Sequence, residues 1–429
     1  MFFSLVRSCR LPMPGIAFTI VLIASCVATQ RVSADVTFNG FATIAVTTHS
    51  NDDILYRSSL VNRPRPSPSL APDSVLGGQL NYYISDRWDA VAQVVLQDPG
   101  DTSLSNYLEM AFIRYRPTRD WSFKAGRINS NLYMLSEFKP VGYAQIWSRP
   151  PLEFYSNASV VSNIDGIEVV HSQDIGNGFL ELGVIAGQTQ PRLKGSTGRL
   201  RADFEELISL SARYTWNEWQ FKSTYARGRV DDPLIPQFDV FEQQVAAVPA
   251  FLWPQKDEVI SRFSGDGDII QYLAGGMKYD DERWNIQAEV GTLDVDWLLF
   301  TSMRFGYFSA AYYYDEFTPF LAVSGAQSKD MDFRFAMPSL PVGTPPELAV
   351  GIAGIITGSN TTITDLLVDQ YSLTAGINWH FYPSWVAKAQ LDHVRMDNPG
   401  TGLFGNNALI GQTSSEIMNV ITLSVSTVF

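Results

Sequence analysis

The chain ends with Ile417-Met-Asn-Val-Ile-Thr-Leu-Ser-Val-Ser-Thr-Val-Phe429, in which apolar and polar side chains largely alternate. A period of two places the apolar residues on one face of a β-strand and the polar residues on the other. The stretch is long for a strand of a soluble sheet, but it suits a tilted strand that crosses a bilayer, which needs about 9–11 residues in the hydrocarbon. The sequence therefore predicts a membrane-crossing strand, with an edge strand of a soluble β domain as the alternative.

The composition favours a β-barrel over a helical membrane protein. Aromatic residues make up 13% of the 429 residues and charged residues only 17%, whereas a soluble protein has about 25% charged residues. The mean hydropathy is nevertheless neutral, at −0.02. A barrel explains both values, because lipid-facing and water-facing residues alternate along each strand and average out.

Similar alternating segments recur along the whole chain, mostly as pairs joined by short turns. Tryptophan follows such a turn five times, at positions 88, 121, 219, 284 and 385, which predicts a ring of tryptophan side chains at one membrane interface. The connections at 231–268 and 328–369 are long enough to hide a further strand, and the apolar run at 348–356 reads as either a strand or a helix. Sixteen strands are expected, at 35–46, 76–84, 88–97, 107–116, 121–128, 164–172, 179–189, 206–214, 219–229, 270–279, 284–292, 303–314, 320–327, 371–381, 385–395 and 417–429.

With its alternating strands, short and long connections and final aromatic residue, the chain resembles the sixteen-stranded outer-membrane porins of Gram-negative bacteria. The resemblance implies a transmembrane antiparallel β-barrel whose short turns face the periplasm and whose long loops face outward. It also implies that Phe429 is the assembly signal read by the barrel-assembly machinery, that lipid and lipopolysaccharide surround the barrel, and that the protein is a homotrimer. Its location would be the outer membrane.

The N-terminus reads as a secretory signal peptide over residues 1–34, with a basic start, an uncharged run and a small-residue cleavage site at Ala34. A lipoprotein cleavage that leaves Cys26 as the first residue is the alternative. Both cysteines, Cys9 and Cys26, precede Ala34, so cleavage there leaves a barrel of residues 35–429 without thiols. That mature chain has 28 basic and 44 acidic residues, a net charge of −16, which argues against nucleic acid as a partner and predicts a channel that prefers cations.

The connection at 129–163 follows the fifth strand and is unusually long and aromatic. A segment this apolar is expected to pack on the inner wall of the barrel instead of extending into water. In the porins that the chain resembles, the third external loop follows the fifth strand and folds inward to form the constriction. The resemblance therefore implies that 129–163 is an inward-folded constriction loop.

The charged residues in and near this loop are the candidates for the constriction. Glu137, Glu153 and Asp165 are the candidate acidic residues, and a facing basic cluster is expected from Arg114, Arg116 and Arg127. Lys139 and Arg149 complete the candidate set. The aromatic residues of the loop could instead form a stacking track for a substrate such as a sugar; they are Tyr133, Tyr143, Trp147 and Tyr155.

These features predict a passive channel for small hydrophilic solutes and ions, in which the charged ring sets ion preference and the diameter sets the size limit. The alternatives are a substrate-selective channel for a sugar or small organic acid and, with less support, a barrel enzyme. The sequence has no nucleophile elbow, P-loop or zinc-protease helix, and adjacent pairs such as His171 and Ser172 face opposite sides of a strand. We therefore expect no enzymatic activity, cofactor or metal site.

Overall fold

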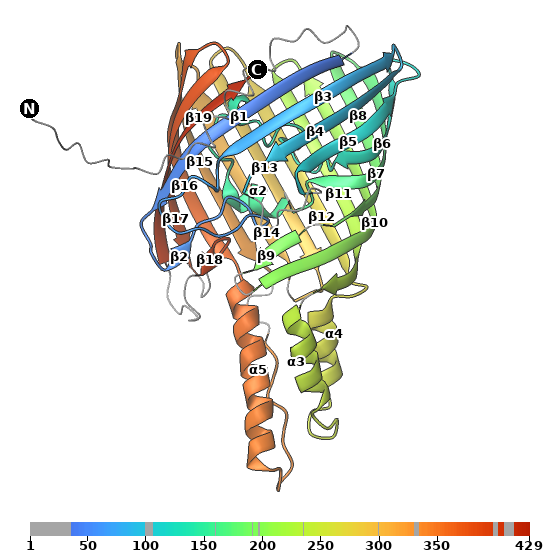
Figure 1. Cartoon of the computed structure of the whole chain (residues 1–429), viewed down its shortest axis with the longest axis vertical. Helices are drawn as coiled ribbons and strands as arrows, with labels where there is room; N and C mark the ends of the chain where they lie inside the picture. The colour runs from blue at the N-terminus through green and yellow to red at the C-terminus, as the bar shows by residue number, and fades with distance from the viewer. Residues whose placement is uncertain are drawn as a thin grey trace, which may run out of the picture.

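The chain folds into a single large antiparallel sheet that closes into a barrel (Figure 1). The structure is a computed structural model that describes residues 36–98, 106–158, 160–190, 192–195, 198–234, 236–298, 300–329, 334–397, 402–406 and 416–429. Sixteen strands form the barrel wall: β1 (Val36–His49), β3 (Val75–Ser85), β4 (Trp88–Leu96), β5 (Leu108–Tyr115), β6 (Trp121–Asn129), β7 (Asn163–Ile175), β8 (Gly178–Thr189), β10 (Gly198–Trp216), β11 (Trp219–Leu234), β12 (Ile269–Asp280), β13 (Trp284–Val295), β14 (Met303–Tyr312), β15 (Phe317–Ser328), β16 (Asp369–Tyr382), β17 (Trp385–Met396) and β19 (Glu416–Val428).

The first and last strands close the barrel. Nine residue pairs join β1 to β19, from Phe41 opposite Val428 to His49 opposite Val420. The backbone N–H of Gly40 donates to the carbonyl of Phe429 at 2.7 Å, and the N–H of Phe429 donates to the carbonyl of Gly40 at 2.9 Å. A closed ladder of this kind has no open sheet edge, which is a requirement for a sheet in hydrocarbon. The predicted antiparallel barrel of sixteen strands is confirmed.

Side chains alternate between the two faces of the wall as the sequence predicts. In β19, Ile421, Leu423 and Val425 expose 46%, 52% and 39% of their surface on the outside. Between them, Thr422, Ser424 and Ser426 are buried inside, at 0%, 5% and 1% exposure. The apolar face of the strand therefore lies where lipid would be, and the polar face lines the interior.

Tryptophans gather at the end of the barrel that carries the short turns. Trp88, Trp121, Trp284 and Trp385 begin their strands directly after a turn, and each exposes between 41% and 44% of its surface. Trp88 stacks on Tyr115 of β5 with ring centroids 4.4 Å apart. This arrangement is the expected aromatic ring at one membrane interface.

The opposite end of the barrel carries the long connections and three helices that extend away from the wall (Figure 1). Helices α3 (Pro236–Ala246) and α4 (Lys256–Ser264) lie between β11 and β12, and α5 (Pro346–Leu366) lies between β15 and β16. Apolar side chains of the three helices pack together around Trp253, Phe263 and Ile352. The apolar run at 348–356 is thus helical, and within the described residues no helix has both the length and the hydropathy to cross a membrane.

Two further segments fold toward the interior. The connection between β1 and β3 contains β2 (Ile54–Leu55), which pairs with β18 (Gly405–Asn406). The connection between β6 and β7 contains a short 3₁₀ helix, η2 (Gly142–Ala144), and the helix α2 (Leu152–Ala158). Figure 1 shows α2 among the strands of the barrel. A short strand, β9 (Arg192–Gly195), pairs with β10 and extends the wall. The expected signal peptide at 1–34, with its two cleavage sites, lies outside the described residues.

Replacing Gly40 by valine (G40V) is expected to weaken barrel closure. A Cβ atom at Gly40 would lie 2.2 Å from Cε2 of Phe429, so the terminal ring would have to leave its place on β1. Overpacking of this kind costs about 1–3 kcal/mol. The measurement is the temperature at which the folded band is lost in semi-native electrophoresis, and it should fall for G40V. A42V adds bulk to the same face of β1 and serves as the control; equal behaviour of the two variants would contradict the closure role of the Phe429 ring.

Candidate pore constriction

The segment between β6 and β7 packs its aromatic side chains against the inner wall. Phe154 is fully buried and lies edge-on to Phe305 and Tyr307 of β14, with centroids 5.3 and 5.6 Å away. Trp147 is also fully buried, and its indole N–H donates to the hydroxyl of Ser309 on the same strand at 3.0 Å. These partners occupy alternate positions of β14, on the face opposite the exposed Phe308. The segment is therefore attached to the interior face of β14.

A buried carboxylate on β13 holds the start and end of this segment together. Glu289 is 3% exposed and accepts a hydrogen bond from the backbone N–H of Met134 at 2.8 Å. It also accepts from the hydroxyl of Tyr307 at 2.9 Å and from the hydroxyl of Tyr155. A buried charge requires such partners, because an unpaired carboxylate away from water is very costly. Glu289 thus fixes the segment to the wall at two points.

Arg149 joins the segment to β17 and to the first long connection. Its guanidinium donates to Asp392 on β17, lies 3.5 Å from a carboxylate oxygen of Asp73, and stacks over the ring of Tyr56 at 4.9 Å. The backbone N–H of Ser148 donates to the side chain of Gln390 at 2.9 Å. Arg149 is only 7% exposed, so it acts as an internal anchor.

Three more buried charges secure the same segment. Glu153 is 1% exposed and accepts hydrogen bonds from Ser324 at 2.6 Å, from Gln370 at 2.7 Å and from Ser372.

Two lysines of the wall bind backbone carbonyls of the segment. Lys388 of β17 donates to the carbonyls of Gly142 and Trp147 at 2.7 and 2.9 Å, and to that of Gln145. Lys222 of β11 donates to the carbonyl of Tyr133 and to Asn131, both at 2.7 Å.

The other candidate charges fall in four different places. Glu137 is exposed and lies 3.8 Å from Arg213 of β10. Lys139 lines a pocket that is described below.

Arg114 and Arg116 both pair with the buried Asp89 near the short-turn end, at 2.9 and 2.8 Å, instead of facing the loop. Arg127 and Asp165 pair with each other at 2.7 Å, on the same side of the wall as the exposed Ile167 and away from the interior.

The aromatic residues of the segment do not line an open track. Tyr133, Trp147 and Tyr155 are 2%, 0% and 3% exposed, because they pack against one another and against the wall. Tyr143 is half-buried, with its ring edge-on to His380 at 6.1 Å. Stacking of a sugar on these rings would require three of them to leave their packing positions.

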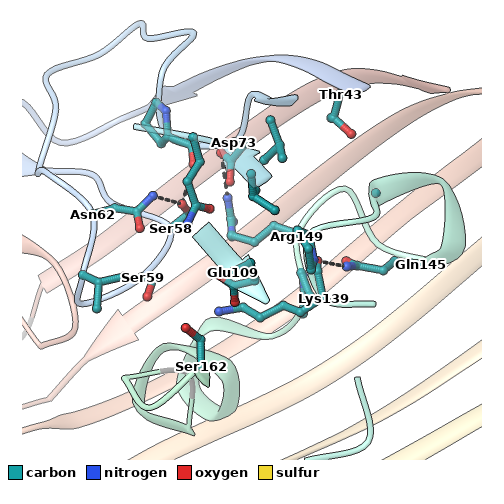
Figure 2. Close-up of a pocket in the computed structure, with 18 of the residues that line it drawn as sticks. Thr43, Ser58, Ser59, Asn62, Asp73, Glu109, Lys139, Gln145, Arg149 and Ser162 are labelled. Carbon is teal, nitrogen blue, oxygen red and sulfur yellow. Dashed lines mark hydrogen bonds and ion pairs between the residues drawn. The ribbon is translucent and has the colours of Figure 1, made fainter. Parts of the chain in front are cut away.

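A polar pocket of about 120 Å³ lies between the segment, the first long connection, and strands β3 to β5 (Figure 2). Lys139 enters it from the segment, and Glu109 enters it from β5. The β4–β5 register is irregular at this point, since Gln93 pairs with Met110 but Val94 pairs with Leu108. This bulge leaves Glu109 as an extra residue and turns its carboxylate inward.

Several residues that matter here were not among the sequence candidates. Glu289, Lys222, Lys388 and Asp392 are charged residues on the inward face of strands whose outward positions are largely apolar, and that pattern was available in the sequence. Glu109 had no such signal, because it faces inward only through the bulge. Asp73 lies in an irregular connection whose path the alternation does not predict.

Comparison with solved structures finds a similar fold in several bacterial outer-membrane proteins. The structure of OprB from Pseudomonas putida matches with a TM-score of 0.52 and 10% identity, covering 97% of each chain. The outer-membrane channel DcaP of Acinetobacter baumannii matches at 0.51 and 11%, covering 93% of this chain and 99% of its own. An anion-selective porin from Comamonas acidovorans matches at 0.50 and 9%, covering 92% and 99%.

The chain has the fold of the sixteen-stranded outer-membrane porins. At this level of identity the likeness concerns the fold alone. No protein-family profile matches the sequence, and no curated protein matches it in sequence.

Replacing Arg149 by methionine (R149M) should release the segment from the wall, because Asp392 and Asp73 lose a buried partner. Breaking one side of a buried pair costs about 3–5 kcal/mol, and about 3 kcal/mol corresponds to a factor of about 100. Amide hydrogen exchange over residues 142–158 should therefore accelerate about 100-fold or more. Arg116→Met is the control, since Asp89 keeps Arg114. Unchanged exchange in R149M would mean that other contacts position the segment.

Proposed function

We propose that the protein is an outer-membrane porin, a passive channel for small hydrophilic solutes and ions, in which segment 129–163 forms the constriction. The observation that carries the proposal is the attachment of this segment, through Arg149, Glu153 and Glu289, to the inner wall of a closed sixteen-strand barrel. A barrel of this size encloses an aqueous lumen unless something fills it. A segment fixed on one part of the wall narrows such a lumen, and we propose that ions and solutes pass along the polar wall beside it.

The location and the partners follow from the same proposal. The exposed apolar faces of the strands and the tryptophan ring suit a bilayer, and the solved structures with this fold include proteins named as an outer-membrane channel and a porin. We propose insertion in the outer membrane of a Gram-negative bacterium, with lipid and lipopolysaccharide around the wall and the helix-bearing loops outside. Assembly through a signal at Phe429 and a homotrimeric state belong to this proposal as well.

The two alternatives have less structural support. A sugar-selective track is disfavoured because Tyr133, Trp147 and Tyr155 are buried. A barrel enzyme built on His171 is disfavoured because this side chain packs against Trp121 on the outward face, with the two rings tilted and their centroids 4.5 Å apart, while Ser172 is on the other side of the strand. Selectivity for a small polar solute other than a sugar stays compatible with the polar pocket.

Planar-bilayer recording with the refolded mature chain tests the proposal. We expect stepwise, ohmic increases in current in molar KCl, and liposomes carrying the protein should swell in small neutral solutes at rates that fall with solute size. The absence of conductance from correctly folded barrels would refute the channel function. Saturable uptake of one solute alone would replace general diffusion by a substrate-selective channel.

The ion preference of the channel should depend on pH through Lys139. Burial lowers the pKa of Lys139 to about 8, so its ammonium is charged near pH 7 and neutral near pH 9. It faces Glu109, with Asp73 and Arg149 lining the same pocket, and its neutralisation leaves the pocket with excess negative charge. The reversal potential in a KCl gradient should therefore shift toward cations between about pH 7 and about pH 9.

Lys139→Met provides the matched control for this experiment. The variant should show the cation preference of the alkaline state already at neutral pH. Because burial also raises the pKa of Asp73 to about 7, any shift that remains in the variant measures the contribution of the carboxylates of the pocket, Asp73 and Glu109. An equal shift in the wild type and the variant would show that Lys139 does not control ion preference.

A further inference from the structure

The polar pocket beside the segment holds two opposite charges, those of Lys139 and Glu109. They do not take part in the contacts that Arg149, Glu153 and Glu289 make with the wall. Lys139 comes from the segment and Glu109 from the bulge of β5, and Figure 2 shows the lysine chain extending across the pocket toward the Glu109 carboxylate. The Lys139 ammonium is attracted electrostatically to Glu109. Within the described part of the chain, it forms no ion pair within 4 Å and no hydrogen bond. The Glu109 carboxylate is hydrogen-bonded to Ser162 at the pocket wall.

The second pair of charges at the pocket is already satisfied. Arg149 is bound by Asp392 and by the hydroxyl of Tyr56, and Asp73 accepts from Thr47 at 2.6 Å. Among the described residues that line the pocket, two side chains are acidic and two are basic, and no ion pair within 4 Å is found for Lys139 or Glu109. A solute with a single charge would bind either Lys139 or Glu109, and the other residue would gain no new partner.

The rest of the lining favours a small polar solute. Hydroxyl and amide groups surround the two charges, including those of Ser58, Asn62, Gln97 and Ser136. The cavity of about 120 Å³ has room for on the order of eight water-sized groups. The one aromatic residue of the lining, Tyr133, is buried and cannot offer its face to a sugar.

The geometry points to a binding site for a small zwitterion, an α-amino acid, between the Lys139 ammonium and the Glu109 carboxylate. The solute carboxylate binds Lys139, the solute ammonium binds Glu109, and the surrounding hydroxyls complete the hydrogen bonds. Glu109 and Lys139 are both half-buried, and each gains an oppositely charged partner with which it can form a charge-assisted hydrogen bond. This inference rests on the proposed channel function and gives it a preferred class of solute.

L-alanine is the probe, compared with three solutes of similar size: uncharged lactamide, anionic propionate and cationic isopropylammonium. Single-channel current is recorded in KCl with each solute added in increasing concentration. Alanine should reduce the current in a saturable way, whereas lactamide should act only in proportion to its concentration. Substituting either charge should weaken the effect of alanine at least tenfold, or about 1.4 kcal/mol.

The single variants should also change which solute acts. Glu109→Gln leaves Lys139 alone and should favour propionate, and Lys139→Met leaves Glu109 alone and should favour isopropylammonium. The double variant E109K/K139E exchanges the two charges, and it should recover block by alanine because a zwitterion can bind in the reverse orientation. Lys329→Met, which removes a lysine paired with Asp294 at the loop end of the wall, should behave as the wild type.

The outcomes separate this inference from the proposed function. A channel that conducts KCl but responds equally to alanine and lactamide would overturn the zwitterion site and leave the porin intact. A folded barrel that conducts no KCl would refute the porin itself. Loss of the alanine effect in both single variants without recovery in the charge exchange would show that these residues support the pocket instead of binding the solute.

Discussion

The need to pair every backbone N–H and C=O group, which the proposed lipid environment imposes, governs this structure. Water is absent from hydrocarbon, so a sheet exposed to lipid must close on itself. The ladder between β1 and β19, completed by Gly40 and Phe429 at the chain end, supplies that closure. Once the sheet closes with sixteen strands, the interior is too wide for the wall side chains alone to fill. The interior therefore takes up other parts of the chain.

The segment between β6 and β7 occupies part of that interior, and buried charges determine where it lies. Apolar packing on β14 buries surface but hardly fixes the orientation of the segment, whereas Arg149, Glu153 and Glu289 each need particular partners at hydrogen-bond distance. Such pairs add little net stability relative to apolar contacts, but the loss of one member is expensive. The segment is thus held in one position, and the pocket at its edge keeps a defined size and charge pattern. The passive filter that we propose requires that constancy.

The strands were predictable because alternation depends only on the local sequence and on the two solvents of the wall. Ile421 on the outward face and Thr422 on the inward face illustrate the alternation, and sixteen segments repeat that pattern. The roles of individual charged residues were harder to predict from the sequence. Order along the chain suggested Arg149 and Glu153 as water-facing residues, but their burial depends on Asp392 and Ser324, which are far away in sequence. Asp165 shares its face with Ile167, so its outward direction was readable, whereas the inward turn of Glu109 depends on a bulge that alternation does not reveal.

Cysteine modification of the pocket is the most direct measurement of the central claim, that ions pass through the barrel interior beside this segment. Ser58 lines the pocket and Ile44 faces outward on β1. A charged methanethiosulfonate reagent should lower the single-channel conductance of S58C and leave that of I44C unchanged. If modification of S58C, verified by mass, leaves the current unaltered, then the ions follow another path and the account of this constriction is wrong.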